Sequence, residues 1–215
     1  MTFEEFLRRY EAAPLIESST FALTAADPNQ LRFQVSYWQK RGYLHALKRG
    51  IYVLDARYRK AELSPLSVAN YLVEPSYLSL EFALSYHGLI PEQARVYTSV
   101  TTKHTRTFTN VLGTFAYRTL KRSLFFGYEP RQAGTQEVLI ATPEKALLDY
   151  LYLNAGSLDA TAEQVESLRL QNLEALSWKD VASSATRFPI KVQRLAGLAA
   201  GAARAAEPQE MTDEG

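Results

Sequence analysis

Residues 32–60 hold the side chains of this sequence whose types and spacing point most directly to a chemistry. Eight of them are lysine or arginine and only Asp55 is acidic, although the chain as a whole has a net charge of only +1. Ammonium and guanidinium groups neutralise phosphate, and this interaction provides most of the salt-dependent affinity for nucleic acids. The cluster therefore indicates a surface that binds a polyanion. The alternative is an amphipathic helix and hairpin whose charges are merely solvated.

Acid–base or metal chemistry has a weaker basis. Glu81 and His87 are six residues apart on one expected helix, and so they lie on different faces and cannot chelate one ion. His87 directly precedes a helix-ending glycine, where an imidazole can bond free carbonyls. Glu144 falls in a first helical turn, where a carboxylate favours the helix dipole, and Asp149 is expected on a polar face or as the partner of Lys145.

None of these four residues falls within a familiar catalytic motif. The sequence contains no nuclease-type acid-x-lysine pair, Asp-x-Asp pair, Walker loop, GxSxG or HExxH motif. We therefore expect no catalytic residues, no metal, no cofactor and no enzymatic activity.

A helix must position part of the basic cluster. Asp27 and Pro28 form an N-cap and a first helical residue, and Gly42 follows the helix where a left-handed cap is favoured. At about 100° per residue, the buried face comprises Leu31, Val35 and Trp38. The opposite face, which can reach base edges and phosphates, comprises Asn29, Arg32, Phe33, Ser36 and Lys40.

A β-hairpin positions the rest of the cluster. Residues 43–47 and 51–54 alternate in polarity around a turn in which Gly50 supplies a positive φ, and the tip is expected to present Lys48 and Arg49 to phosphate. Together with a capped first helix at Thr2, this order predicts an N-terminal winged helix-turn-helix over residues 1–60. Phe33 is the exception on the helix face, because it could instead pack against residues 61–72.

The remainder predicts an α+β fold. Residues 61–153 contain helices and five strand-like segments between 94 and 142, which we expect to form an antiparallel sheet. Residues 154–206 predict a helical extension, near 161–176, 178–186 and 189–206, that packs either on the sheet or on a partner. Residues 207–215 are acidic, lack apolar anchors and predict a disordered tail.

Several other properties bear on location and surface. The chain has no cysteine, no apolar run of about 20 residues and a charged N-terminus, so we expect a cytoplasmic protein that does not enter membranes. A second basic block spans residues 95–131. It either extends the DNA path, meets an RNA or an acidic partner, or keeps sheet edges soluble. Its members, with His104, are Arg95, Lys103, Arg106, Arg118, Lys121, Arg122 and Arg131.

Three segments in this order resemble one protein family. They are LKRGIYVL (47–54), YLSLEFALSYHGLI (77–90) and VLIATPEKALLDYLYL (138–153). The chain is similar in them to antitoxins of the AbiEi type, the transcription-regulating halves of bacterial abortive-infection toxin–antitoxin pairs used in antiviral defence. The resemblance covers roughly residues 3–153. It implies a winged helix that represses its own operon and a C-terminal domain that opposes a nucleotidyltransferase-like toxin encoded alongside.

The resulting prediction is a DNA-binding repressor and antitoxin. Residues 1–60 would bind double-stranded DNA at inverted repeats near the protein's own promoter, and the rest would oppose the cognate toxin. Two alternatives stay open: a nucleic-acid-binding accessory subunit of a nuclease or other defence enzyme, and a protein–protein module whose winged helix no longer binds DNA. The oligomeric state also stays open.

Overall fold

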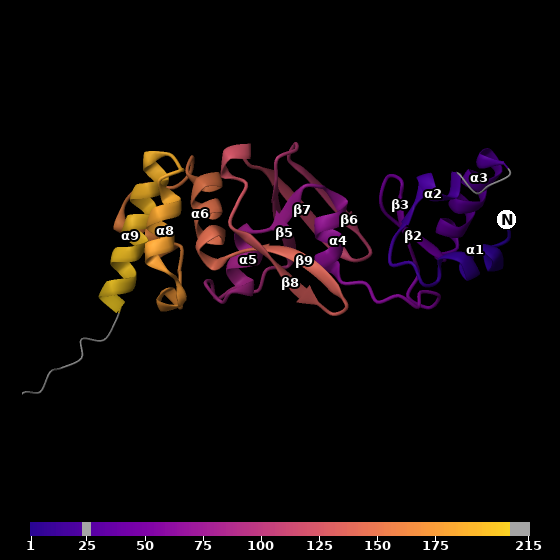
Figure 1. The fold of residues 1–215 in the computed structure, drawn as a ribbon, viewed down its shortest axis with the longest axis horizontal. Helices are drawn as coiled ribbons and strands as arrows, with labels where there is room; N and C mark the ends of the chain where they lie inside the picture. The colour runs from indigo at the N-terminus through magenta and orange to yellow at the C-terminus, as the bar shows by residue number, and fades with distance from the viewer. Residues whose placement is uncertain (23–26, 207–215) are drawn as a thin grey trace, which may run out of the picture.

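The protein is an elongated α+β molecule with three parts along its long axis (Figure 1). The computed structural model describes residues 1–22 and 27–206. An N-terminal unit occupies one end, a six-stranded sheet with its helices lies in the centre, and further helices form the other end. None of the helices in these ranges is both long and apolar enough to cross a membrane. The predicted tail, residues 207–215, lies outside the described residues.

The N-terminal unit is built around α3, with a small antiparallel sheet beside it. Its strands lie in the order β1-β3-β2. The Thr2 capping box at the first helix is confirmed, as is the Asp27 cap of α3, whose carboxylate accepts from the backbone N–H groups of Asn29 and Gln30. The elements are α1 (Phe3–Tyr10), β1 (Ile16–Glu17), α2 (Ser18–Ala22), α3 (Pro28–Lys40), β2 (Leu44–Lys48) and β3 (Ile51–Leu54).

The central unit is a mixed sheet with the strand order β6-β7-β5-β4-β9-β8. Its elements are α4 (Pro65–Leu72), β4 (Ser76–Leu78), α5 (Leu80–Tyr86), β5 (Val96–Thr101), β6 (Arg106–Asn110), β7 (Gly113–Thr119), a short 3-10 turn (Arg122–Leu124), β8 (Tyr128–Ala133), β9 (Gln136–Ala141) and α6 (Pro143–Asn154).

The expectation of a purely antiparallel sheet is wrong. Strand β5 pairs in parallel with β7, and β4 pairs in parallel with β9. The first pairing arises because β6 forms a hairpin with β7 on the outer edge, so that β7 returns beside β5 in the same direction. The second depends on β4, a three-residue strand that is too short to give an alternating pattern in the sequence.

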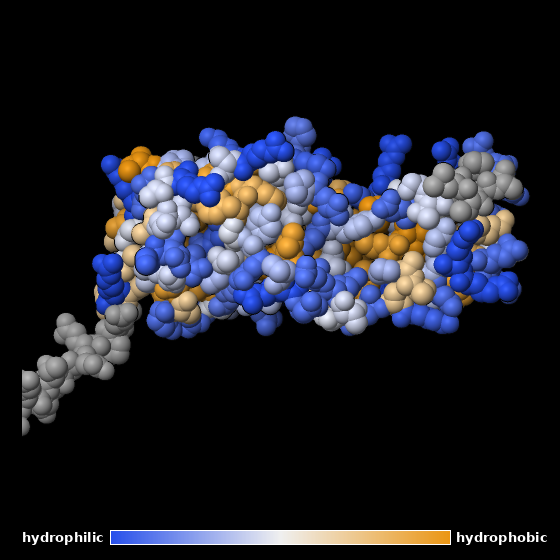
Figure 2. Space-filling model, in the orientation of Figure 1, coloured by the Kyte–Doolittle hydropathy of each residue, from blue (hydrophilic) through white to orange (hydrophobic). Residues whose placement is uncertain are grey.

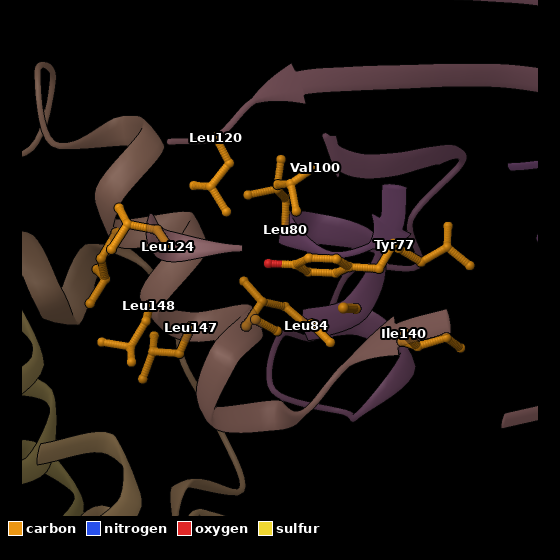
Figure 3. Close-up of a cluster of buried hydrophobic side chains, with 14 of the residues drawn as sticks. Tyr77, Leu80, Leu84, Val100, Leu120, Leu124, Ile140, Leu147 and Leu148 are labelled. Atoms are coloured by element: carbon orange, nitrogen blue, oxygen red, sulfur yellow. The ribbon is translucent and has the colours of Figure 1, made fainter. Parts of the chain in front are cut away.

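Helices cover both faces of this sheet. The Tyr117 hydroxyl donates to the carbonyl of Ala69 in α4, whereas the Tyr77 hydroxyl donates to Asp149 in α6. Leu78 and Tyr117 share one face, because each is the partner of Ser99 in β5, and Tyr77 points to the other face. Figure 3 shows Tyr77 among the buried apolar side chains of α5, α6 and the neighbouring strands.

The C-terminal helices share the core of the central unit. They are α7 (Ala162–Ser167), a 3-10 turn (Leu173–Ala175), α8 (Trp178–Ala185) and α9 (Ile190–Ala206). The helix expected at 161–176 is interrupted, because Arg169 and Asn172 adopt left-handed backbone angles. Buried side chains of α8 and α9, such as Val181 and Leu195, belong to the same core as α6. The extension therefore packs on the chain itself, through α6.

The β2–β3 hairpin joins the N-terminal unit to the centre. Its apolar residues Leu47, Ile51 and Val53 are buried in the central core, and the side-chain amide of Asn110 in β6 donates to the carbonyl of Leu47 at 3.1 Å. Figure 2, in the same orientation, shows apolar side chains gathered around these strands. The ammonium of Lys48 donates to the carbonyl of Leu72, the last residue of α4, at 2.6 Å. Lys48 is thus a cap for the end of α4.

This contact predicts that Lys48 and Arg49 differ in their effect on stability. Lys48→Met keeps the apolar stem but removes the donor to Leu72, and it should lower the free energy of unfolding by about 1–2 kcal/mol. Arg49→Met, one residue further along at an exposed position, should change it by less than about 0.5 kcal/mol. Urea denaturation of both variants measures the difference, and equal effects would contradict the cap.

Candidate nucleic-acid interface

Helix α3 divides into a buried and an exposed face as the sequence predicts. Leu31, Val35 and Trp38 are buried and pack against α1 and the strands of the N-terminal unit. Asparagine, serine and the basic residues lie on the other side. All five side chains of the predicted contact face are exposed: Asn29, Arg32, Phe33, Ser36 and Lys40.

The exposed face of α3 is available to a partner. The helix contains no acidic residue, and within the described ranges the side chains of Arg32, Ser36 and Lys40 have no hydrogen-bonding or ion-pairing partner. Phe33 is 78% exposed, so the alternative in which it packs against residues 61–72 is wrong. Figure 1 places α3 toward the tip of the elongated molecule, and Figure 2 shows that end to be largely hydrophilic.

Tyr37 in α3 and Arg41, the residue that follows the helix, extend the exposed face. Arg41, the C-cap of α3, donates from Nε to the hydroxyl of Tyr37 at 3.1 Å, and its guanidinium lies 5.3 Å from the centre of the Tyr37 ring. Tyr37 is itself 52% exposed. The contact-face prediction omitted both residues, although their spacing of four, which brings side chains together on a helix, was visible in the sequence.

Of the two basic side chains predicted at the hairpin tip, only that of Arg49 is exposed to solvent. Lys48 is directed to Leu72, and burial, with the nearby charges of Arg106 and Lys103, lowers its pKa. Arg49 is exposed. The expectation that the tip presents both side chains to phosphate is therefore wrong for Lys48. Burial of Leu47 and Ile51 in the central core draws the turn toward α4.

Intramolecular ion pairs engage two more members of the basic cluster. Arg57 pairs with Asp55 at 2.6 Å and Lys60 pairs with Glu11 at 2.8 Å. Hydrogen bonds from His45 and Arg57 hold the pKa of the Asp55 carboxyl well below its usual range. Six members of the cluster have no carboxylate partner among the described residues, and Lys48 is the one of these that bonds a backbone carbonyl instead. The other five are Arg32, Lys40, Arg41, Arg49 and Arg59.

The second basic block does not form one surface of free charges. Arg118 donates to the carbonyl of Leu153 at 3.0 Å and Arg131 pairs with Glu129 at 2.7 Å, so both contribute to the fold. Lys103 and Arg106 are exposed and lie close enough to Lys48 to lower its pKa. This end of the block therefore adjoins the hairpin.

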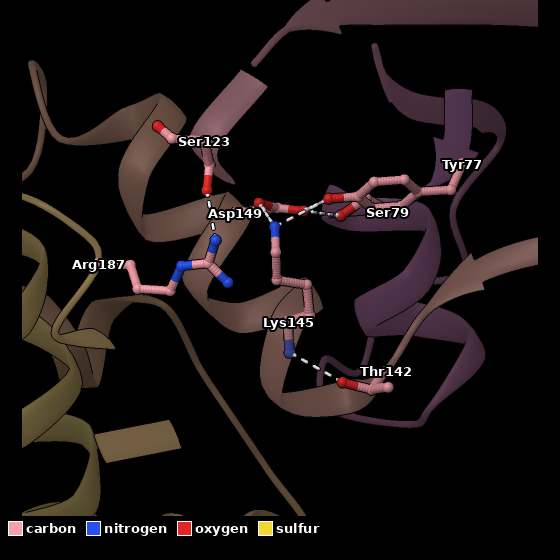
Figure 4. A network of polar contacts seen from close by, with 7 residues as sticks. All are labelled: Tyr77, Ser79, Ser123, Thr142, Lys145, Asp149 and Arg187. Carbon is pink, nitrogen blue, oxygen red and sulfur yellow. Dashed lines mark hydrogen bonds and ion pairs between the residues drawn. The ribbon is translucent and has the colours of Figure 1, made fainter. Parts of the chain in front are cut away.

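The buried polar cluster of the protein lies in the central unit (Figure 4). The ammonium of Lys145 forms an ion pair with Asp149, one turn further along α6, and donates to the hydroxyl of Tyr77 at 2.8 Å. The hydroxyls of Tyr77 and Ser79 each donate to Asp149 at 2.9 Å. The predicted partnership of Lys145 and Asp149 is confirmed. A polar-face position for Asp149 is wrong, because the side chains are 2% and 0% exposed.

The contacts of Lys145 and Asp149 hold elements of the core together. Burial lowers the pKa of Lys145 and raises the pKa of Asp149, and the attraction between the two groups opposes both shifts. The rings of Phe126 and Phe188 lie 5.0 and 5.6 Å from the ammonium and complete its surroundings. The Lys145 ammonium and both oxygens of the Asp149 carboxylate each contact another side chain of this protein (Figure 4).

The other candidates for acid–base chemistry also make structural contacts. Nε2 of His87 lies 2.8 Å from the carbonyl of Ala141 in β9, and so it bonds a carbonyl of a neighbouring strand and not one of its own helix. Glu144 lies in the first turn of α6, as predicted, and accepts from the backbone N–H of Ser177 at 3.1 Å. In residues 1–22 and 27–206, no three His, Asp or Glu side chains converge to hold a metal ion.

No family model matches the sequence, and no curated protein matches it either. The resemblance to AbiEi-type antitoxins therefore stays a prediction that rests on the three segments themselves.

The buried pair predicts a large effect for a small change. Asp149→Asn leaves the Lys145 ammonium uncompensated in the core, and it should lower the free energy of unfolding by about 3–5 kcal/mol. The double variant Lys145→Met/Asp149→Leu, which removes both charges, should lose clearly less stability than the sum of the losses of Lys145→Met and Asp149→Leu alone.

A matched control is the exposed pair of Glu129 and Arg131. Glu129→Gln, which also neutralises one carboxylate, should cost no more than about 1 kcal/mol. Urea denaturation followed by circular dichroism measures all these variants. An Asp149→Asn protein as stable as the Glu129→Gln protein would contradict the proposed importance of the buried pair.

Proposed function

We propose that the protein is a DNA-binding transcriptional regulator in which α3 enters the major groove. The N-terminal unit would act as a winged helix-turn-helix, with α2 and α3 as the helix pair and β2–β3 as the wing. The order of elements, with a strand before the helix pair and a two-stranded ribbon after it, supports this proposal. In this arrangement Arg49 alone would contact phosphate from the turn of the wing, because the Lys48 ammonium is directed to Leu72.

The observation that carries the proposal is the exposed, acid-free face of α3. Helix α3 has 13 residues and is about 20 Å long, and the diameter of an α-helix with its side chains, about 10–12 Å, suits a major groove about 12 Å wide. Asn29, Arg32 and Ser36 offer hydrogen bonds to base edges, and Lys40 offers a charge to phosphate. The same residues have no structural task within the described part of the chain, unlike the paired bases Arg57 and Lys60.

Phosphate contacts in this proposal run from α3 toward the centre of the molecule. Lys40 and Arg41 lie at the C-terminal end of α3, and Arg49 lies at the turn of the hairpin. Lys103 and Arg106 adjoin that turn. These positions would let one stretch of duplex contact both the helix and the ribbon, with the backbone contacts fixing its register.

A repressor should lose affinity steeply with salt, with a log–log slope of about −0.9 per phosphate neutralised. Arg49→Ala should flatten the slope for DNA from upstream of the protein's own gene by about one unit, because it removes one phosphate contact. Lys48→Ala, whose ammonium is directed to Leu72, should leave the slope unchanged. Fluorescence anisotropy between about 50 and 300 mM salt measures both slopes. Absence of salt-dependent binding would exclude the regulator.

The antitoxin role in this proposal rests on the resemblance alone. If it holds, co-expression should relieve the growth arrest caused by a nucleotidyltransferase-like product of the adjacent gene. Arg32→Ala/Ser36→Ala should abolish repression of a reporter yet keep this relief, because the changes are confined to α3. A nuclease or helicase as the co-purifying neighbour would instead favour the accessory-subunit alternative, and loss of both activities together would argue against two separate surfaces.

A further inference from the structure

Among the large apolar side chains whose exposure the structure describes, Phe33 is the most exposed, at 78%. It lies near the middle of α3, as the sixth of 13 residues. Its neighbours on the exposed face are hydrogen-bonding or cationic. Removing a phenyl ring from water is favourable, and so a ring held in solvent at this position is a candidate for contact with a ligand.

The position of Phe33 on the helix restricts what it can contact. At about 100° per residue, Ser36 and Lys40 lie within about 20° of Asn29, one on each side of it, and Phe33 lies about 40° from Asn29 on the same exposed face. A ring so close to the centre of the face enters any groove that the polar residues enter. Tyr37 lies further round the helix and is engaged by Arg41.

The chemistry of the major groove then selects the target of the ring. Each base pair presents hydrogen-bond donors and acceptors there, but the only apolar group on a base edge is the 5-methyl group of thymine. Phosphate oxygens offer a phenyl ring nothing comparable. The positive charges around the ring, Arg32, Lys40 and Arg41, fit the negative potential of the duplex and disfavour a basic protein partner.

We propose that Phe33 is a specificity-determining residue that contacts the 5-methyl group of a thymine in the DNA site. The inference rests on the proposed function. It adds which base is recognised, which chemical group of that base is contacted, and which residue makes the contact. The protein's preferred site therefore contains a thymine at a fixed position, or at equivalent positions in the two halves of an inverted repeat.

The test removes the methyl group and nothing else. Binding sites are first selected from random double-stranded DNA with the wild-type protein. Each thymine of the selected duplex is then replaced singly by uracil, which keeps the base pair and every hydrogen-bonding group. At one thymine, or its symmetry mate, the wild-type protein should bind about fourfold more weakly, the effect of one buried methyl group. The remaining thymines should show no change.

Variants of the ring complete the cycle. Phe33→Ala should bind the thymine duplex more weakly and should no longer distinguish thymine from uracil at that position. Phe33→Leu, which keeps an apolar contact, should retain part of the discrimination. Ile190→Ala in α9, which also removes an exposed apolar side chain (62% exposed) but lies at the other end of the molecule, should bind both duplexes as the wild type does.

Three outcomes would overturn the inference in different ways. If wild-type protein binds every uracil duplex as tightly as the parent, Phe33 contacts no methyl group and the regulator proposal survives. If Phe33→Ala weakens binding but keeps the thymine preference, another residue contacts the methyl group. If the selection enriches no sequence and no salt-dependent binding is seen, the proposed function fails and the role of Phe33 fails with it.

Discussion

The buried pair of Lys145 and Asp149 is the interaction on which the arrangement of the central layers depends. Placing an ammonium and a carboxylate in a core costs several kcal/mol per ion unless each finds its partners. Here the partners come from different parts of the chain: Tyr77 from β4, Ser79 from the start of α5, and the ring of Phe188 from the segment before α9. The sheet, α6 and the C-terminal helices must therefore meet in one arrangement for the pair to be satisfied.

This requirement changes what individual residues do locally. Ser79 is the N-cap residue of α5, but its hydroxyl makes no capping bond and donates to Asp149 instead. Thr142, at the start of α6, keeps the usual capping role and accepts from the backbone N–H of Lys145. The first turn of α5 is satisfied instead by β5, because the Thr98 hydroxyl accepts from the backbone N–H of Phe82 at 2.9 Å. Ser79 can therefore serve the buried carboxylate, which would be costly to leave unpaired in the core.

The N-terminal unit has a comparable division between its two sides. On one side, the hairpin buries Leu47 and Ile51 in the central core and directs Lys48 to the end of α4. On the other side, α3 keeps its polar face exposed. Packing with the centre thus holds the helix in place from behind, and the residues proposed to contact DNA contribute little to the fold. Substitutions at Asn29, Arg32 or Ser36 can therefore report on binding without the confounding effect of unfolding.

The sequence by itself determined the features that depend on neighbours along the chain. The caps at Thr2 and Asp27, the buried and exposed faces of α3, and the pairing of Lys145 with Asp149 follow from spacings of three or four residues, which helix geometry converts directly into contacts. The tertiary structure decided the mixed order of the sheet, the burial of the ion pair and the engagement of Lys48 by Leu72. These three features depend on which segments, distant in the sequence, lie side by side. The alternation of residues along one strand does not say which strand will be its neighbour. Neighbours are selected by the free energy of burying apolar surface, and the whole core contributes to that free energy.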